Sequence, residues 1–484
     1  MTLALDAKQQ WVVDDVMRGK HQGGVLLAGL PGSGKTNVAA AITMLHDVDV
    51  VLLVCPVKGT RIGWTNTFKR AGYTSEFFML DLANRENFER LKNGDPGIYI
   101  LGREYLIAAA TKRGQREALI EWPAVKTIDI AIYDENHSVQ NRKGASFREW
   151  KRVKPKVLKI AMSGTWFGNK FSGAWAVTRA LWPHLIDLSF WRWAETYAEV
   201  YDAPTKYNPE VGDYDTVHTA GAERTPGAFV KTLPAYYIWE ADLPEGDPAN
   251  ADTNQFSLFV ELSPKHRKAY SQMEDDALTW LAGNPLQAQL PVSKRTRLRQ
   301  IALAYPSVEY TGEVDEDGTP KARVWFEPNA VSAKIDAFNE YLEDHPDENM
   351  LVGTDSKIFA DILQGRLKAN VTLWTGDTKP SERERILETW GQGPEREVLV
   401  ATIPSLAEGV DGFQHVCSTL VWMNKSTNPL LNTQFLGRLR RRGQRSIVTE
   451  VEIIAVETED TPDNNRIAVS HKNRLASQGK ENVL

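Results

Sequence analysis

Short apolar runs alternate with amphipathic stretches through the first third of the chain. Each run is four to eight residues long and closes at polar, proline or glycine positions, which is typical of buried parallel strands joined by helices. We expect such strands over residues 25–28, 48–55, 97–101, 128–133 and 159–162. Strands that alternate with helices in this way predict a parallel sheet covered on both faces.

The same alternation returns near Ser332. A helix is expected over residues 333–343. The apolar runs that follow predict four further strands, over residues 350–353, 371–374, 398–401 and 419–423. These elements predict a second α/β domain.

Between the two regions, residues 183–328 follow neither pattern. Aromatic residues, prolines and acidic loops interrupt helical stretches, of which the clearest cover residues 265–282 and 294–304. The predicted fold class is therefore α/β, with two parallel-sheet domains and a helical, aromatic-rich insertion or linker between them. We expect domains over residues 1–185 and 331–458, the insertion over 186–330, and a flexible C-terminal tail over 459–484.

The composition of the 484 residues is that of a soluble globular protein, with 42% hydrophobic and 25% charged residues. No apolar run approaches the roughly 18 residues of a membrane span, and the N-terminus lacks the pattern of a signal peptide. Cys55 and Cys417 lie in apolar runs, which predicts buried thiols in a reducing compartment. The net charge of −6 means that any contact with nucleic acid must come from local basic patches.

Residues 29–36 carry the strongest chemical pattern in the chain. Gly29, four residues, and then Gly34-Lys35-Thr36 stand between a predicted strand and a predicted helix. In this setting glycines, including Gly32, let backbone N–H groups converge on a phosphate, the lysine neutralises its oxygens, and the threonine hydroxyl holds Mg²⁺. A tight turn that happens to carry a lysine is the other interpretation, and the full spacing disfavours it. We predict a site for a nucleoside triphosphate.

A carboxylate pair follows the strand expected at residues 128–133. At the carboxyl end of a parallel strand, Asp134 can complete the Mg²⁺ shell beside a phosphate loop, and Glu135 can polarise the attacking water. A solvated turn is the alternative, but this pair ends an apolar strand and has His137 two places beyond the glutamate. Gln9, on an amphipathic helix ahead of the phosphate loop, can read an adenine edge through its amide, although a plain surface position is more common for an isolated glutamine.

The second predicted domain has no phosphate loop and instead carries an arginine-rich segment over residues 434–444. Phosphoryl transfer needs positive charge on the γ-phosphate in the transition state, and an arginine from a facing domain supplies it only when the cleft closes. Hydrolysis would then be coupled to domain movement. A second basic group, Lys294, Arg295, Arg297 and Arg299, fits a solvated face and a phosphate-contacting face equally well.

Taken in order, these motifs resemble those of superfamily 2 helicases, and within them the Swi/Snf-type DNA translocases. The resemblance rests on segments spread over nearly the whole chain to about residue 456, namely Gln9; Gly29 to Thr36; Val54-Cys55-Pro56 with Trp64; Asp134-Glu135-Asn136-His137 with Asn141; Ser163-Gly164-Thr165 with Asn169; Leu262-Ser263-Pro264 with Tyr270; Leu298 to Ile301; Glu408-Gly409 with Asp411; and Asn428-Pro429, Gln434, Gly437, Arg438, Arg441, Gly443 and Gln444. The chain departs from the family at Asn136, Trp166 and Gln140, where alanine, proline and lysine are usual. These departures leave the residues for phosphate chemistry unchanged. They affect instead the contacts that such proteins make with their partners.

The resemblance implies two RecA-like domains that bind ATP and Mg²⁺. It assigns catalysis to Lys35, Glu135, Arg438 and Arg441. Nucleotide contacts are implied for Gln9, Gly29, Gly32, Gly34, Lys35, Thr36, Gly409 and Asp411, and Mg²⁺ contacts for Thr36 and Asp134. Contacts with DNA phosphates in such proteins fall near the positions of Lys58, Thr165, Thr354 and Thr402.

The function implied is that of an ATP hydrolase, a DNA helicase or translocase that moves along duplex or branched DNA in replication, recombination or repair. We expect DNA to be bound without marked sequence preference, with no membrane association and with a monomeric or weakly associating chain. No histone-reading region fits within this length, so we expect a compact enzyme in the cytoplasm of a prokaryotic cell or a phage-infected host.

Two alternatives stay open. The first is an RNA-dependent or single-strand-unwinding helicase with the same motor, and the second is a nucleotide-gated scaffold that binds DNA without processive movement. The second is disfavoured because both Glu135 and Arg441 are present. A base-stacking wedge for strand separation could lie among Trp191, Trp193, Tyr236, Tyr237 and Trp239, although clustered aromatic residues more often pack against their own core.

Overall fold

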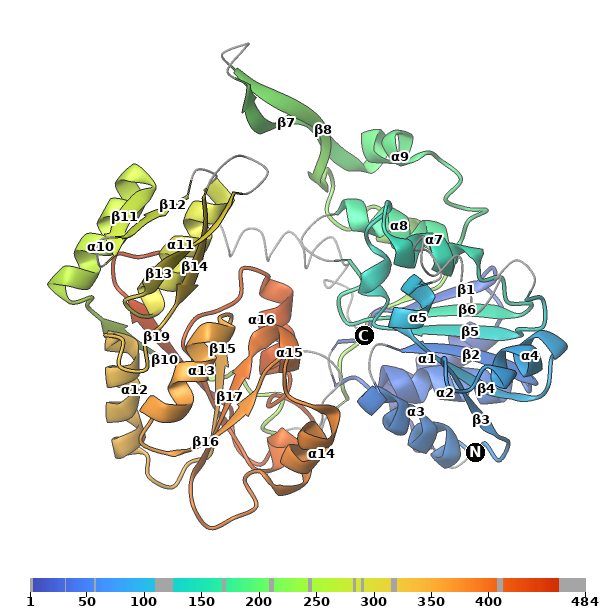
Figure 1. Cartoon of the computed structure of the whole chain (residues 1–484). Coiled ribbons are helices and arrows are strands. Elements are labelled where there is room, and N and C mark those ends of the chain that lie inside the picture. The colour runs from blue at the N-terminus through green and yellow to red at the C-terminus, as the bar shows by residue number, and fades with distance from the viewer. Residues whose placement is uncertain are drawn as a thin grey trace. The chain divides into compact units, whose positions relative to one another are not determined.

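A computed structural model of the chain describes residues 3–30, 32–55, 58–108, 125–167, 171–208, 213–242, 246–281, 284–288, 291–314, 320–406 and 412–460. The chain divides into two compact units, with the division between residues 242 and 243. Each unit is built on its own parallel sheet, so the predicted fold class is confirmed (Figure 1).

The sheet of the first unit has seven strands in the order β3-β4-β2-β5-β6-β1-β9, and all neighbours run parallel. Its strands are β1 (Gly24–Leu27), β2 (Val50–Cys55), β3 (Phe77–Leu80), β4 (Gly97–Gly102), β5 (Ile130–Asp134), β6 (Leu158–Met162) and β9 (Tyr236–Tyr237). Strands β1, β2, β4 and β6 are buried along their whole length, which explains why the sequence shows continuous apolar runs there.

Helices cover both faces of this sheet, with α2 and α3 on one side and α7 and α8 on the other (Figure 1). The helices of the first unit are α1 (Ala7–Met17), α2 (Lys35–Leu45), α3 (Lys58–Arg70), α4 (Glu86–Asn93), α5 (Arg103–Ala108), α7 (Ala145–Arg152), α8 (Ser172–Leu181) and α9 (Phe190–Tyr197), with short 3₁₀ turns η2 (Asn136–Val139) and η3 (Val230–Thr232). All five strands predicted from the sequence are present, each within two residues of its expected bounds. Strands β3 and β9 were not predicted.

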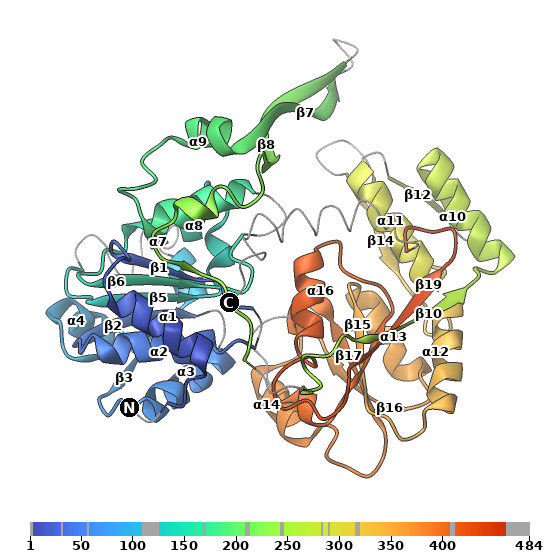
Figure 2. The same cartoon turned by 180° about the vertical axis from the view of Figure 1, so that it is seen from behind.

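A long antiparallel hairpin of β7 (Ala198–Asn208) and β8 (Asp213–Glu223) extends away from the sheet of the first unit (Figure 2). The segment that follows it returns to the sheet, where β9 pairs with β1. Trp193, Tyr237 and Trp239 are buried in the hydrophobic core of the first unit, and Trp191 and Tyr236 pack against the same core. The core-packing interpretation of these aromatic residues is therefore confirmed, because none of the five stands free to separate strands.

The sheet of the second unit has six parallel strands in the order β10-β19-β18-β15-β17-β16. They are β10 (Asn254–Val260), β15 (Met350–Thr354), β16 (Asn370–Trp374), β17 (Glu397–Thr402), β18 (Thr419–Trp422) and β19 (Thr449–Ala455). Strands β15, β16, β17 and β18 match the four predicted ones, whereas β10 and β19 were missed. Strand β10 lies in the expected insertion, and it pairs with β19, the last of the described strands.

The second unit also holds two antiparallel hairpins and seven described helices. The hairpins are β11 (Leu278–Leu281) with β12 (Asn284–Gln287), and β13 (Ser307–Val314) with β14 (Pro320–Trp325). The helices are α10 (Pro264–Asp276), α11 (Pro291–Leu303), α12 (Ala333–Asp344), α13 (Lys357–Arg366), α14 (Pro380–Thr389), α15 (Ile403–Leu406) and α16 (Pro429–Leu436), with a 3₁₀ turn η4 (Phe413–His415).

The helix expected over residues 265–282 is wrong beyond Asp276. Ala277 has a φ of 52°, in the left-handed region, which ends α10 and turns the chain into β11. The helix expected at 294–304 and the one at 333–343 are present as α11 and α12. Most of the tail expected over residues 459–484 lies outside the described residues.

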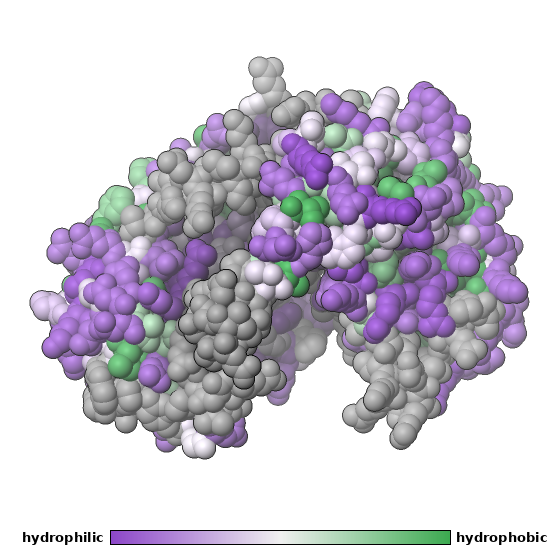
Figure 3. Space-filling view, turned by 90° about the horizontal axis from the view of Figure 1, so that it is seen from above, coloured by the Kyte–Doolittle hydropathy of each residue, from purple (hydrophilic) through white to green (hydrophobic). Residues whose placement is uncertain are grey.

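Hydrophilic residues cover most of the described surface on the side that Figure 3 views, with hydrophobic residues in small patches between them. Among the described helices, none combines the length and the apolar character needed to span a membrane. Cys55 and Cys417 are buried free thiols, as predicted.

Candidate nucleotide-binding site

The phosphate loop connects β1 to α2, as its sequence predicts. Gly34 has a φ of 77°, in the left-handed region that favours glycine. A Cβ at Gly29 would lie 2.4 Å from Ser33 Oγ and 2.8 Å from the indole of Trp239, so a side chain there would fill the loop. The loop geometry therefore requires glycine at both positions.

Lys35 and Thr36 form the first turn of α2. The Lys35 Nζ donates hydrogen bonds to the carbonyl oxygens of Gly29 and Leu30, at 2.7 and 3.1 Å, so the ammonium group lies over the loop. Gly34 caps the helix without a side-chain hydrogen bond. The first-turn N–H groups and the Lys35 charge thus present a cradle that suits a phosphate.

Asp134 ends β5 at the same edge of the sheet as the phosphate loop. It pairs in register with Met162 of β6, and Met162 pairs with Leu27 of β1, so the three residues lie at one level across adjacent strands. The carboxyl edge of a parallel sheet is where ligands bind in folds of this class. The structure therefore brings Asp134 and the phosphate loop to one site, as the sequence predicts.

The Asp134 carboxylate is partly buried, and its negative charge is only partly compensated. Its Oδ2 accepts a hydrogen bond from the indole Nε1 of Trp64 at 2.9 Å, and its Oδ1 accepts one from the Glu135 N–H at 3.0 Å. Burial, followed by the charge of Glu135, raises the pKa of Asp134 above its usual range, although the Trp64 hydrogen bond and the charge of Lys35 oppose the shift.

Glu135 stands in a polar cluster with His137 and Ser163. Its backbone is in the left-handed region, with a φ of 53°, and its Oε2 accepts a hydrogen bond from Ser163 Oγ at 3.1 Å. The His137 Nδ1 lies 3.2 Å from the same carboxylate oxygen and 3.2 Å from Ser163 Oγ. Ser163, in the turn after β6, therefore contacts Glu135, the residue expected to position the attacking water.

The donor set fits Mg²⁺. In phosphate-binding sites this ion takes one or two carboxylates and completes its shell with phosphate oxygens and water. The partly buried Asp134 carboxylate, whose charge is only partly compensated, and the Thr36 hydroxyl at the helix N-terminus match that pattern. No group of three or more His, Cys, Asp or Glu is gathered as a metal site in the part of the chain that the structure describes.

The side chains of Gln9 and Trp239 both donate hydrogen bonds to the phosphate loop. The Ser33 carbonyl oxygen accepts a hydrogen bond from Gln9 Nε2 at 3.0 Å and another from Trp239 Nε1 at 2.9 Å. The Gln9 Oε1 in turn accepts from the Asp6 N–H at 3.3 Å, in a capping box that begins α1. Both ends of the Gln9 amide are thus engaged within the protein, and its adenine contact stays a prediction.

Sequence reasoning missed the parts played by Trp64 and Trp239. The sequence marks Trp64 only as part of a motif, and its distance of 70 positions from Asp134 gives no local signal. Trp239 ends a five-residue apolar run, Ala235 to Trp239, which could have been read as a strand beside the loop.

Arg438 and Arg441 lie in the turns after α16 in the second unit. The Arg438 N–H donates to the Phe435 carbonyl oxygen and the Arg441 N–H to that of Leu439, both at 3.0 Å. The buried Gln444 holds these turns, because its Nε2 donates to the carbonyl oxygens of Cys417 and Leu439 at 3.0 and 3.1 Å. Backbone hydrogen bonds within the turns, together with the Gln444 side chain, therefore hold this segment in place.

The four residues expected near DNA are differently placed. Thr165, Thr354 and Thr402 are buried, and the hydroxyls of the last two bond to Asn424 Oδ1 and Ser405 Oγ, each at 2.8 Å. Their DNA contacts stay predictions. The Lys58 side chain, Gly409 and Asp411 lie outside the described part of the chain.

Comparisons with known proteins give two family matches. Residues 2–167 match the family described as "Type III restriction enzyme, res subunit", and residues 333–443 match the "Helicase conserved C-terminal domain". No curated protein matches the chain.

The fold is similar to that of S. cerevisiae Dbp5 bound to RNA and ADP BeF3, with a TM-score of 0.51 and 13% identity over 97% of this chain and 88% of that one. The Sulfolobus solfataricus SWI2/SNF2 ATPase core in complex with dsDNA aligns at a TM-score of 0.38 and 18% identity, over 99% of this chain and 94% of that one. From the two family matches, the chain carries the paired helicase domains of superfamily 2, with the phosphate loop and Asp134 on the first of them.

Proposed function

We propose that this protein is an ATP- and Mg²⁺-dependent motor that moves along duplex or branched DNA. The observation that carries the proposal is the meeting of the phosphate loop, Asp134 and Glu135 at one edge of a parallel sheet, in a chain with paired helicase domains. A phosphate cradle beside two carboxylates suits hydrolysis of a nucleoside triphosphate.

In this proposal each residue of the first unit has a separate task. Lys35 moves from the loop carbonyls to the β- and γ-phosphate oxygens, and Thr36 and Asp134 hold Mg²⁺. Bound Mg²⁺ neutralises charge that develops on the phosphates. Glu135, oriented by Ser163 and His137, positions the attacking water and accepts its proton.

The second unit contributes positive charge and the coupling to movement. Arg438 and Arg441 stabilise charge on the γ-phosphate during hydrolysis, and Gly409 and Asp411 belong to the same nucleotide-responsive machinery. DNA is held mainly through its phosphates, at contacts near Lys58, Thr165, Thr354 and Thr402, so that binding is salt-dependent and shows little sequence preference.

The cellular setting is also a proposal. Two buried free thiols fit a reducing compartment, and we place the enzyme in the cytoplasm of a prokaryotic or phage-infected cell, acting in replication, recombination or repair.

The test is an ATPase assay with one polymer at a time: duplex, forked, four-way and single-stranded DNA, and RNA. The proposal expects the largest stimulation from duplex or junction DNA. Stimulation by RNA alone would instead favour an RNA helicase, and binding of DNA without any stimulated turnover would favour a nucleotide-gated scaffold.

A further inference from the structure

A cavity of about 560 Å³ lies within the second unit, between α11 and the start of α13. Four basic side chains and one carboxylate line it, namely Arg295, Arg297, Arg299, Lys357 and Asp355. Helix α11 lies outside the two segments that match helicase families. We call this space the α11 cavity.

Helix α11 combines buried apolar residues with arginines that line the cavity. Leu298, Ile301 and Ala302 are buried in the core of the second unit. At 100° per residue, Arg295 and Arg299 fall on one flank of this buried side and Arg297 falls on the other. The sequence left open whether these arginines form a solvated face, and the structure places them around a concave space.

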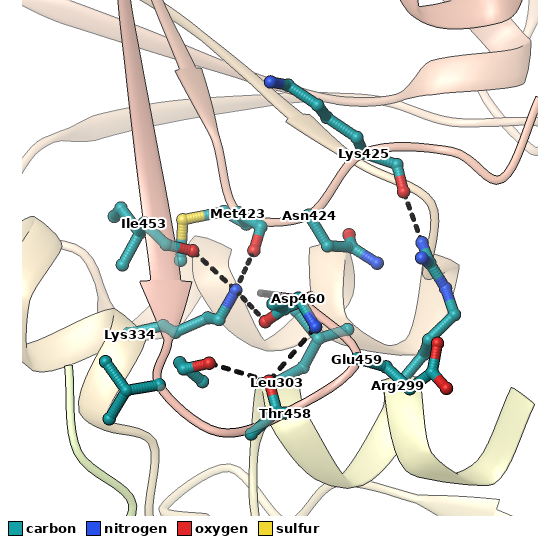
Figure 4. Close-up of polar contacts among 12 residues, drawn as sticks. Arg299, Leu303, Lys334, Met423, Asn424, Lys425, Ile453, Thr458, Glu459 and Asp460 are labelled. Carbon is teal, nitrogen blue, oxygen red and sulfur yellow. Dashed lines mark hydrogen bonds and ion pairs between the residues drawn. The ribbon is translucent and has the colours of Figure 1, made fainter. Parts of the chain in front are cut away.

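Arg299 and Lys357, which line the α11 cavity, are already neutralised by carboxylates. Arg299 lies 3.8 Å from Asp355. It also donates to the carbonyl oxygen of Lys425 (Figure 4). Lys357 pairs with Asp377 at 2.9 Å and with Asp361 at 3.4 Å. These two residues shape the cavity more than they add charge to it.

Arg297 differs from the other three. Its guanidinium donates to the neutral Gln300 Oε1 at 2.9 Å, and within the described residues it meets no carboxylate. Burial lowers the pKa of Arg297, so its charge is held at a cost that an anion in the cavity would offset. Arg295 pairs with Glu459 at 3.1 Å, but its side chain is 55% exposed, so the pair is weak and a phosphate group can compete for this second cation.

The residues that line the α11 cavity suit an anionic group and offer few contacts to other kinds of ligand. Arg side chains bind phosphate oxygens in a bidentate manner, and the N-terminus of α13, capped by Ser356, adds the favourable end of a helix dipole. Among the described residues, no aromatic ring lines the cavity, so these residues give a base nothing to stack on. A single carboxylate is a poor set of ligands for a cation.

We propose that the α11 cavity binds phosphate groups of a nucleic-acid backbone, with Arg297 as its principal contact and Arg295 as its second. The inference rests on the proposed function, since it gives the DNA motor a phosphodiester site on its second unit. It goes beyond that function because it assigns the contact to α11, which lies outside the two segments that match helicase families.

The test compares Arg295→Gln/Arg297→Gln with Arg385→Gln in the full chain. Arg385 is an exposed arginine on α14, in the same unit and away from the cavity, so its variant removes charge without touching the site. Fluorescence anisotropy with a short labelled duplex is measured from about 50 to about 200 mM salt. Melting curves establish that each variant is folded, and Arg297→Lys serves as the charge-preserving variant.

The double variant is expected to bind duplex at least about tenfold more weakly, and its log–log salt slope should fall by about one for each phosphate that the protein no longer neutralises. Arg385→Gln should match the wild type, and Arg297→Lys should keep most of the affinity. Wild-type affinity and slope in a folded double variant would overturn the assignment. If the double variant does not fold, the exposed Arg295→Gln alone should still lower the slope, and an unchanged slope there would contradict it.

A second experiment distinguishes binding of a nucleic-acid polymer from binding of a small anion. Binding of inorganic tripolyphosphate is measured with the same variants in a Lys35→Ala background, which weakens the phosphate loop. Loss of tripolyphosphate binding with unchanged duplex affinity would mean that the cavity takes a free polyphosphate, contrary to the proposal. Failure of any polymer to stimulate the wild-type ATPase would instead contradict the proposed function, whichever way the cavity variants behave.

Discussion

The indole Nε1 of Trp64 donates a hydrogen bond to Oδ2 of Asp134 over 2.9 Å, from α3 to the end of β5. Trp64 is itself buried and stacks on Phe68, so its ring is held in place. The bond leaves one fixed orientation for the carboxylate that we expect to hold Mg²⁺. Partners of this kind orient metal ligands and commonly affect metal affinity by roughly 10–100-fold.

Trp64→Phe should therefore raise the Mg²⁺ concentration needed for half-maximal ATPase activity by about tenfold. The rate at saturating Mg²⁺ should change much less, because the phenyl ring keeps the packing. Trp182→Phe is the matched control, since it removes another buried indole donor, to the His21 carbonyl oxygen, in the same unit. An unchanged Mg²⁺ dependence in Trp64→Phe would show that the bond is structural only.

Glu135→Gln should still bind ATP but turn over at least about a hundredfold more slowly. The amide can keep the contact with Ser163 Oγ but cannot accept a proton from water. Nucleotide affinity and turnover should be measured on the same preparation, beside Lys35→Ala, which should lose hydrolysis together with phosphate affinity. Equal loss of affinity and turnover in Glu135→Gln would make Glu135 a structural residue.

Arg441→Ala should leave ATP binding nearly intact and remove the DNA-stimulated part of hydrolysis. A group that acts only in the transition state affects turnover and not ground-state affinity. Arg442→Ala, at the exposed neighbouring position, is the control. If stimulated turnover survives in Arg441→Ala, Arg438 is the better candidate, because the Arg440 guanidinium already donates to the Ala249 carbonyl oxygen.

The buried pair of Lys334 and Asp460 should govern the stability of the second unit. The Lys334 ammonium also donates to the carbonyl oxygens of Met423 and Ile453, and the two charged side chains are 1% and 7% exposed (Figure 4). Asp460→Ala leaves a buried charge without its partner and should cost about 3–5 kcal/mol of unfolding free energy.

The adjacent residue gives a matched comparison for that pair. Glu459 pairs with Arg295 at the surface, with side chains 33% and 55% exposed. Glu459→Ala should therefore cost no more than about 1 kcal/mol. Urea unfolding of both variants decides the point, and similar small losses would show that the Lys334–Asp460 pair contributes little.

The sequence was sufficient for those parts of the fold that depend on local patterns. The phosphate loop and the strand that ends at Asp134 could be predicted because apolar runs, glycine spacing and a terminal carboxylate are all short-range signals. The contacts of Trp64 and Trp239 could not, since they join residues 70 and 206 positions apart.

The missed strands have a similar cause. Strand β9 is only two residues long and lies within an aromatic run that is as typical of core packing as of a strand. Strand β10 is largely exposed, so it forms no apolar run. Strand β10 takes its place by pairing with β19, almost two hundred positions later. The local sequence of either segment does not indicate which distant strand it will pair with.

The central claim is that ATP hydrolysis drives movement along intact duplex DNA, and a triplex-displacement assay tests it most directly. The wild-type protein should displace a third strand from a duplex in the presence of ATP and Mg²⁺, whereas Lys35→Ala should not. A forked duplex run in parallel should be unwound poorly, because the aromatic residues considered for a wedge pack against the core of the first unit. Strong unwinding of the fork with no triplex displacement would contradict the account and indicate a strand-separating helicase.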